Sequence, residues 1–155
     1  MNVDAIFEEA RLILGDLAEK IESPARNRLD IYLKQPEELK TVAIRLRAKK
    51  LSTLSCITGL DLGVDCPDLE ILYHFCVGPA VITVRCRICK AEASIPSLIQ
   101  IIPSAEPFER ELAEMFGVRI AGLHTTEYLY LPDEWKPGMP PLRKDFDQTK
   151  LALAS

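Results

Sequence analysis

The sequence lacks any apolar run near the roughly 18 residues that a membrane-spanning helix needs. Its first residues include Asp4, Glu8 and Glu9, where a secretory signal peptide would carry basic residues. It contains no internal repeat, no low-complexity segment and no linker that would divide it. We therefore expect a single domain of 155 residues that is neither secreted nor itself embedded in a membrane.

Patterns that carry catalysis are equally scarce. Gly59 and Gly63 are isolated glycines that belong to no phosphate-binding motif. His74 and His124 have no acid and nucleophile near them in the sequence. The net charge of −4 argues against nucleic acid as the main partner, because phosphate contacts need clustered Lys and Arg. The basic run at residues 45–50 fits the solvated face of a predicted helix. We expect no catalytic residue, no metal ligand and no cofactor-binding residue in this chain.

The five cysteines lie mostly within apolar strand patterns, which favours reduced thiols over a disulfide framework. Cys86 and Cys89 form a Cys-x-x-Cys motif, a spacing also found in iron–sulfur and zinc sites. On a strand, residues three apart point to opposite faces, so the two sulfurs cannot easily reach one metal ion. We therefore expect structural thiols. The alternative is a small cytosolic iron–sulfur electron carrier that uses Cys86 and Cys89.

Hydrophobic periodicity predicts the order of the helices and strands. Helices are expected at residues 4–21, from Pro36 onward, at 95–102 and around Glu109. Strands are expected at residues 28–34, 51–62, 69–77 and 81–90, the last two joined by a turn at 78–80. This order predicts an α+β fold, a small and mostly antiparallel sheet with helices packed on it. Residues 1–122 would form this domain, and residues 123–155 an extended Pro-rich interaction arm that does not fold independently.

The helix around Glu109 is expected to begin after Ser104, a candidate N-cap, and to end at Gly117, a candidate C-cap. Phe108, Leu112, Met115 and Phe116 form its apolar face.

The spacing of the polar residues predicts which face of this helix each one lies on. Arg110 and Glu114, four apart, are expected to pair on the exposed face, with Glu109 also solvated. Glu111 points along the apolar side, where a carboxylate needs a cation. We hypothesise that Arg143 or Lys144 pairs with Glu111 and clamps the arm onto the domain.

The arm combines chain-breaking residues with apolar anchors. Four prolines and a glycine between residues 132 and 141 exclude a helix or a central strand there. The same region is rich in aromatic and aliphatic side chains: Tyr128, Leu129, Tyr130, Leu131, Trp135, Leu142 and Phe146. Disordered segments are poor in such residues, whereas interface hot spots are rich in them. We expect a surface shared by the domain and a partner. The alternative is an arm that wraps only its own domain.

Two sequence blocks at matching spacing carry a family resemblance. The first runs Glu109-Arg110-Glu111 and then Glu114-Met115-Phe116-Gly117-Val118. The second runs Leu131-Pro132-Asp133-Glu134-Trp135 and then Pro141-Leu142-Arg143-Lys144-Asp145-Phe146. Together they resemble the signature of the 30-kDa subunit of complex I (NADH–quinone oxidoreductase). The relatives of that subunit serve in energy-converting membrane-bound NiFe hydrogenases.

The resemblance implies a non-catalytic scaffold subunit of a complex I-like, membrane-bound, redox-driven ion pump, peripheral on the cytoplasmic side of the membrane. The implied partners are the catalytic subunit related to the NiFe-hydrogenase large subunit and a neighbouring iron–sulfur subunit, and no cofactor is implied for this chain. The implied interface and signature residues are Glu109, Arg110, Glu111, Glu114, Phe116, Gly117, Trp135, Leu142, Arg143, Lys144, Asp145 and Phe146.

One stretch departs from the complex I version of this family. After Gly122 the sequence reads Leu123-His124-Thr125-Thr126-Glu127, where complex I members have His-Pro-Asp followed by basic residues. This departure favours an energy-converting hydrogenase over an NADH–quinone oxidoreductase.

Overall fold

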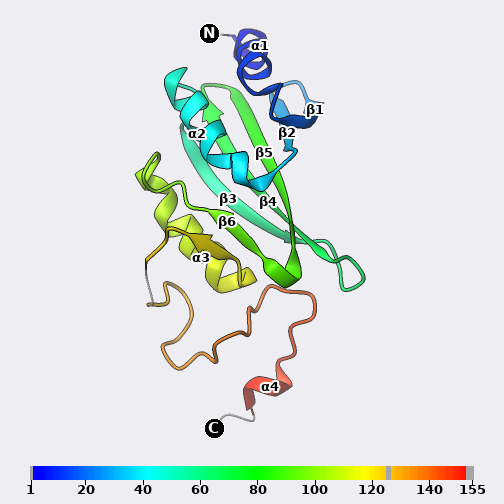
Figure 1. Ribbon diagram of the computed structural model, residues 1–155, viewed down its shortest axis with the longest axis vertical. Helices are drawn as coiled ribbons and strands as arrows, with labels where there is room; N and C mark the ends of the chain where they lie inside the picture. The colour runs from blue at the N-terminus through cyan, green and yellow to red at the C-terminus, as the bar shows by residue number, and fades with distance from the viewer. Residues whose placement is uncertain (1, 125–126, 153–155) are drawn as a thin grey trace.

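The computed structural model describes residues 2–124 and 127–152. It contains a five-stranded sheet in the order β1-β2-β5-β4-β3, with helices packed on one face (Figure 1). The strands are β1 (Ala18–Ala25), β2 (Arg28–Leu33), β3 (Leu54–Asp61), β4 (Asp68–Val77) and β5 (Ala80–Cys89). The helices are α1 (Val3–Leu14), α2 (Leu39–Ala48), α3 (Glu106–Phe116) and the short α4 (Thr149–Ala152). The predicted α+β class with a mostly antiparallel sheet is confirmed.

Short elements complete the domain. A second sheet pairs β6 (Ser94–Pro96) with β7 (Arg119–Ala121) in parallel. Three 3-10 turns, η1 (Pro36–Glu38), η2 (Lys90–Glu92) and η3 (Pro103–Ala105), lead into α2, β6 and α3. Within the large sheet, β2 and β5 pair in parallel, whereas its other neighbouring strands are antiparallel. The β2–β5 pair joins the β1–β2 hairpin to the β3–β4–β5 meander.

The predicted helix at residues 4–21 is wrong beyond Leu14. Gly15 follows α1, and the chain turns back at Ala18 to form β1 at the edge of the sheet. Ile21, expected on the helix, instead pairs with Ile31 of β2. Pro24 is tolerated in β1 because an edge strand does not need every N–H for the ladder.

The predicted helix at residues 95–102 is also wrong. Residues 94–96 form β6 because β7, some 25 residues later, provides its ladder partner. Ser104 lies in the η3 turn, and α3 begins at Glu106 after Ala105, whose methyl side chain cannot accept a capping bond. The predicted end of this helix is confirmed, since Gly117 adopts the left-handed conformation at φ 65°.

The face of the sheet away from the helices carries charged residues, among them Arg85 and Arg87 of β5. Arg85 bridges two buried carboxylates: its Nη1 lies 2.8 Å from Asp30 Oδ2 and its Nη2 lies 2.8 Å from Glu70 Oε2. Arg28 Nε lies 2.8 Å from Asp30 Oδ1, so two guanidinium groups compensate the charges of the two buried acids.

Helix α3 packs on β3 at Gly59. A Cβ atom at this position would lie 2.6 Å from two ring carbons of Phe116 and 3.0 Å from Leu112 Cδ1. Real Cβ atoms do not approach carbon atoms this closely, so the missing side chain is what allows the Phe116 ring to lie on the strand. This contact fixes the height of α3 above the sheet.

We therefore expect Gly59→Ala to lower the free energy of unfolding by about 1–3 kcal/mol, because the Phe116 ring must move out of a packed site. Urea unfolding followed by circular dichroism would measure the change. Adding Phe116→Leu to Gly59→Ala is expected to recover part of the loss, since the smaller side chain makes room. A neutral Gly59→Ala variant would contradict the proposed close packing.

Candidate functional site: α3 and the C-terminal segment

The C-terminal segment, defined here as residues 127–152, runs beneath α3 on the side of the molecule away from α1 (Figure 1). Its described residues up to Gln148 form turns and bends, and α4 follows. Thr125, Thr126 and residues 153–155 of the predicted arm lie outside the described residues. The division into a 1–122 domain and a 123–155 arm stays a prediction.

Glu114 of α3 holds the start of this segment. Its carboxylate accepts hydrogen bonds from three consecutive backbone N–H groups, those of Leu129, Tyr130 (2.9 Å) and Leu131 (3.3 Å). Arg110, one turn earlier on the helix, donates from Nη2 to the carbonyl oxygen of Glu127 at 3.1 Å. The predicted pairing of Arg110 with Glu114 is therefore wrong, because both side chains bond to the segment.

Arg143 fastens the segment to the end of α3. The last carbonyl groups of a helix have no partner within the helix and need donors from elsewhere. Arg143 Nε donates to the carbonyl oxygen of Phe116 at 2.6 Å, and the Leu142 N–H donates to that of Met115 at 2.9 Å. Arg143 Nη1 also reaches the carbonyl oxygen of Lys90 at 3.4 Å. The segment thus caps the helix with one side chain and one backbone donor.

Asp61, at the end of β3, receives the next residue of the segment. Its Oδ2 accepts from the Lys144 N–H at 2.9 Å, and its Oδ1 accepts from the Gly63 N–H at 2.9 Å and lies 2.6 Å from Lys90 Nζ. Burial raises the pKa of Asp61, but Lys90 and the two N–H donors outweigh it and lower the pKa from 3.8 to about 2. The carboxylate is therefore ionised, and it joins β3, η2 and the segment.

Two predicted anchors of the arm pack on each other. The rings of Trp135 and Phe146 stack with their centroids 6.1 Å apart and their planes at 19°. Trp135 Nε1 donates to the carbonyl oxygen of Met139 at 2.9 Å. The stack closes the proline-rich turn into a loop, so these two aromatic residues hold the segment's own shape.

The buried acid of α3 is Glu109, not Glu111. Glu109 is wholly buried and accepts hydrogen bonds from the Leu98 N–H at 2.6 Å and Ser97 Oγ at 2.7 Å, and burial raises its pKa. The predicted clamp between Glu111 and Arg143 or Lys144 is wrong, since Arg143 donates to carbonyl oxygens instead. Glu109 precedes Phe116 by seven residues, a helical spacing that could have placed it on the buried face.

Cys86 and Cys89 lie on opposite faces of their strand, as the spacing predicted, and His74 lies between two threonines. Cys86 is buried and Cys89 is exposed, on opposite faces of β5, and burial raises the pKa of the Cys86 thiol. His74 lies between Thr58 Oγ1 (3.2 Å) and Thr83 Oγ1 (3.1 Å), and burial lowers its pKa. Within residues 2–124 and 127–152, no three His, Cys, Asp or Glu side chains gather closely enough to hold a metal ion. Nor does any helix in this described part have the length and apolar character needed to cross a membrane.

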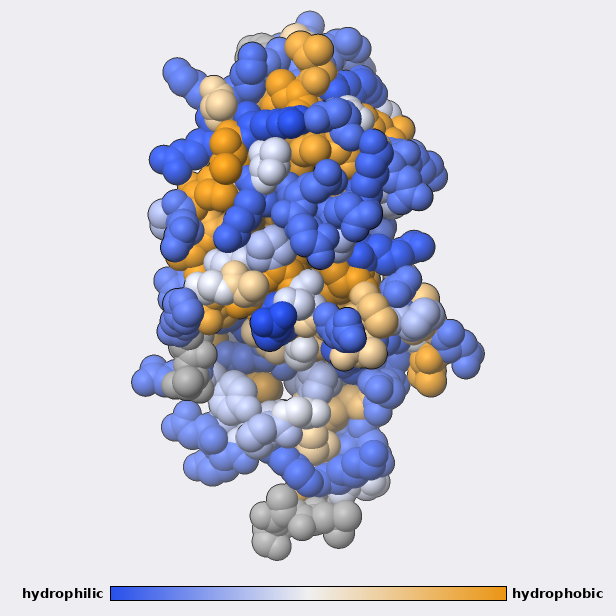
Figure 2. Space-filling model, in the orientation of Figure 1, coloured by the Kyte–Doolittle hydropathy of each residue, from blue (hydrophilic) through white to orange (hydrophobic). Residues whose placement is uncertain are grey.

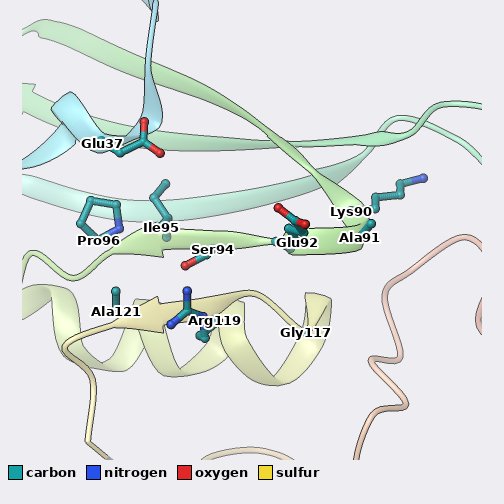
Figure 3. A pocket seen from close by; sticks show the side chains of 11 residues that line it. Glu37, Lys90, Ala91, Glu92, Ser94, Ile95, Pro96, Gly117, Arg119 and Ala121 are labelled. Atoms are coloured by element: carbon teal, nitrogen blue, oxygen red, sulfur yellow. The ribbon is translucent and has the colours of Figure 1, made fainter.

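A groove of about 770 Å³ borders the attachment site of the segment (Figure 3). Its floor includes the outward residues of the β6–β7 pair, such as Ser94 and Arg119, with Glu37 of η1 and Glu92 of η2 at its sides. Lys90 lies at one end of the groove, where its backbone carbonyl meets Arg143. A partner bound along the segment would therefore have this groove beside it.

We expect Arg143→Ala to release the segment from α3 because the Phe116 and Lys90 carbonyl oxygens lose their charged donor. Loss of such bonds costs about 1.5–3 kcal/mol locally. That cost corresponds to at least about tenfold faster chymotrypsin cleavage at Leu142 and Phe146, which lie next to Arg143. The global unfolding midpoint is expected to change much less. Lys136→Ala, on an exposed residue of the same segment, serves as the control. Equal cleavage of both variants would contradict the role of Arg143.

This chain is similar in sequence to one family of respiratory-chain subunits. The sequence matches the family described as the respiratory-chain NADH dehydrogenase 30 Kd subunit over residues 32–151. An NADH-quinone oxidoreductase subunit of Roseiflexus sp. (strain RS-1) is 34% identical over 130 residues, which cover 77% of this chain and 70% of the relative. The equivalent NADH-quinone oxidoreductase subunit of Dinoroseobacter shibae is 39% identical over 101 residues, 64% of this chain and 46% of the relative. The chain thus spans about half to two thirds of the length of these relatives.

Two solved structures share the fold. A chain of the membrane-bound sulfane sulfur reductase, an archaeal respiratory membrane complex, superposes with a TM-score of 0.72 and 25% identity, covering 96% of this chain and 89% of that chain. A trypsin-resistant fragment of Nqo5 gives a TM-score of 0.65 at 24% identity over 81% of this chain and 99% of the fragment, which shows the fold alone. From the extent of the sequence match, which includes α3 and nearly all of the segment it holds, we conclude that this chain belongs to the respiratory-chain NADH dehydrogenase 30 Kd subunit family.

Proposed function

We propose that this chain is a non-catalytic scaffold subunit of a complex I-like, membrane-bound, redox-driven ion pump. In this role it binds the catalytic subunit related to the NiFe-hydrogenase large subunit. The observation that carries the proposal is how the C-terminal segment is attached. Its backbone N–H groups bond to Glu114, Met115 and Asp61, so side chains such as Leu142 (52% exposed) and Tyr130 (62% exposed) remain free. A segment fixed by its backbone presents these apolar side chains to a partner.

The energy-converting hydrogenase branch is favoured over the NADH–quinone branch. The departure after Gly122 separates this sequence from the usual complex I pattern. The archaeal sulfane sulfur reductase chain superposes on 96% of this chain with a TM-score of 0.72. Both observations support a subunit of a hydrogenase-like complex, and we propose that it lies on the cytoplasmic side of the membrane.

Affinity purification of the tagged chain from native membranes tests the proposal. We expect a large subunit related to NiFe hydrogenases and a small iron–sulfur subunit to co-purify. Nickel in the large subunit would support the hydrogenase branch, and a flavin- and NADH-binding module would support the NADH–quinone branch. Recovery of the chain alone, coloured and loaded with iron, would overturn the scaffold role in favour of an electron carrier.

A paired variant tests the segment directly. Leu129→Ser with Tyr130→Ser removes two exposed apolar side chains while the Glu114 bonds to the backbone remain. We expect at least about tenfold less large subunit to co-purify, because truncating interface anchors typically costs more than 1 kcal/mol each. The control is Leu12→Ser with Ile44→Ser, which changes two exposed aliphatic residues on α1 and α2. Equal loss in both variants would contradict a specific role for the segment.

A further inference from the structure

The loop between β3 and β4 projects from the body of the protein and carries exposed aliphatic side chains. Figure 1 shows this loop extending away from the sheet, and Figure 2 shows hydrophobic surface at the same place. Leu60, Leu62 and Val64 are all exposed, Val64 to 70%. Exposing neighbouring aliphatic side chains at the tip of a hairpin is unfavourable in water unless a partner covers them.

The length of this loop is not required by the sheet. At the other end of β4, Gly78 and Pro79 alone connect Val77 to Ala80 of β5. The β3–β4 ladder, in contrast, ends at the pair Asp61–Leu69, and residues 62–67 form an extension beyond it. The extension therefore has a use other than connecting two antiparallel neighbours.

Lys90 holds both sides of the extension. Its Nζ donates to the carbonyl oxygen of Gly63 at 2.6 Å and lies 2.6 Å from Asp61 Oδ1. Its backbone N–H donates to the carbonyl oxygen of Pro67 at 2.7 Å. A loop fixed at both sides loses little conformational entropy when it binds, which is the property of a preorganised docking element.

The charge of the loop indicates which kind of surface it fits. The sequence from Leu60 to Leu69 contains no Lys or Arg, and it includes the exposed Asp65 and the half-buried Asp68. Membrane-inserting loops pair apolar residues with Lys or Arg that attract anionic lipid headgroups. The acidic loop fits a protein pocket with an apolar floor and a basic rim.

We propose that the β3–β4 loop is a second docking element, which inserts Leu62 and Val64 into an apolar, basic-rimmed pocket of the subunit that also binds the C-terminal segment. This inference rests on the proposed function. Asp61 supports a common partner, because it joins the base of the loop to the segment through the Lys144 N–H. The two docking elements thus share one attachment point, the Asp61 carboxylate.

The test uses the tagged chain in cells that carry the complex. Leu62→Ser with Val64→Ser removes the apolar tip without touching Lys90 or Asp61. We expect about tenfold or greater loss of the co-purifying large subunit, with an unchanged unfolding midpoint. The matched control, Leu12→Ser with Ile44→Ser, is expected to retain the partner within about twofold.

Three outcomes would overturn the inference. The first is partner recovery by the loop variant equal to that of the wild type. The second is binding of the wild-type chain to phosphatidylcholine–phosphatidylglycerol vesicles that the loop variant loses, which would assign the tip to a lipid surface. The third is a dimer of the isolated chain that the loop variant loses, which would assign it to a second copy. Failure of the wild type itself to recover any redox subunit would instead refute the proposed function.

Discussion

Glu109→Ala is expected to lower the free energy of unfolding by about 2–4 kcal/mol, a substantial fraction of the stability of a small domain. The wholly buried carboxylate accepts hydrogen bonds from the Leu98 N–H and Ser97 Oγ. Alanine removes both acceptors and leaves those donors buried without a partner, together with a cavity. Chemical unfolding monitored by circular dichroism would measure the loss.

Two further variants make this result specific. Glu109→Gln keeps one carbonyl oxygen for the Leu98 N–H, so it is expected to lose less stability than Glu109→Ala. Glu111→Ala, on the same helix, removes a carboxylate without an assigned ion pair and is expected to change stability by less than about 1 kcal/mol. Equal losses for Glu109→Ala and Glu111→Ala would contradict the assignment of Glu109 as the structural acid.

The pH dependence gives an independent readout for Glu109. Because burial raises the pKa of Glu109 above its ordinary value of 4.5, the folded protein holds this proton to a higher pH than the unfolded chain does. The free energy of unfolding is therefore expected to decrease as the pH rises from 4.5 through the raised pKa. The Glu109→Gln variant is expected to lack this part of the profile. Identical pH profiles of stability for the wild type and Glu109→Gln would contradict a raised pKa of Glu109.

Asp61→Asn is expected to lower the free energy of unfolding by about 2–4 kcal/mol, because it leaves the largely buried Lys90 ammonium without its partner. The same change weakens the acceptor for the Gly63 and Lys144 N–H groups. We therefore expect both the β3–β4 loop and the C-terminal segment to exchange amide hydrogens faster. Hydrogen exchange by mass spectrometry would locate the effect at residues 62–67 and 140–148.

Asp65, an exposed acid of the β3–β4 loop, provides the control for Asp61→Asn. Asp65→Asn changes an exposed acid of the same loop and is expected to alter stability by less than about 0.5 kcal/mol. The pKa of Asp61 is lowered to about 2, so its stabilisation is present above pH 3.8 and is lost as the pH falls toward 2. Asp61→Asn is expected to flatten that part of the acid-unfolding profile. Unchanged hydrogen exchange in the segment would contradict its attachment at Asp61.

The sequence by itself determined the elements whose signal is local. Alternation of apolar residues predicted β2, β4 and β5 and placed Cys86 and Cys89 on opposite faces, because successive side chains on a strand alternate between its two sides. Gly117 marked the end of α3 because glycine adopts the left-handed conformation at no steric cost. The two signature blocks identified the family. Each of these signals depends only on residues close together in the chain.

Only the tertiary structure decided which residues meet. Strands β1 and β6 appear as strands because β2 and β7 supply their hydrogen-bond partners, whereas Ile21 and Ile95 also fit helical spacing. The partners of Arg143 are backbone carbonyl oxygens of Phe116 and Lys90, and every residue type has such an oxygen. Gly117 marks the last carbonyl oxygens of α3 as acceptors without a helical donor, but no side-chain pattern shows which distant donor reaches them. The attachment of the segment was therefore decided by the position of the end of α3 beside η2, a property of the packed fold.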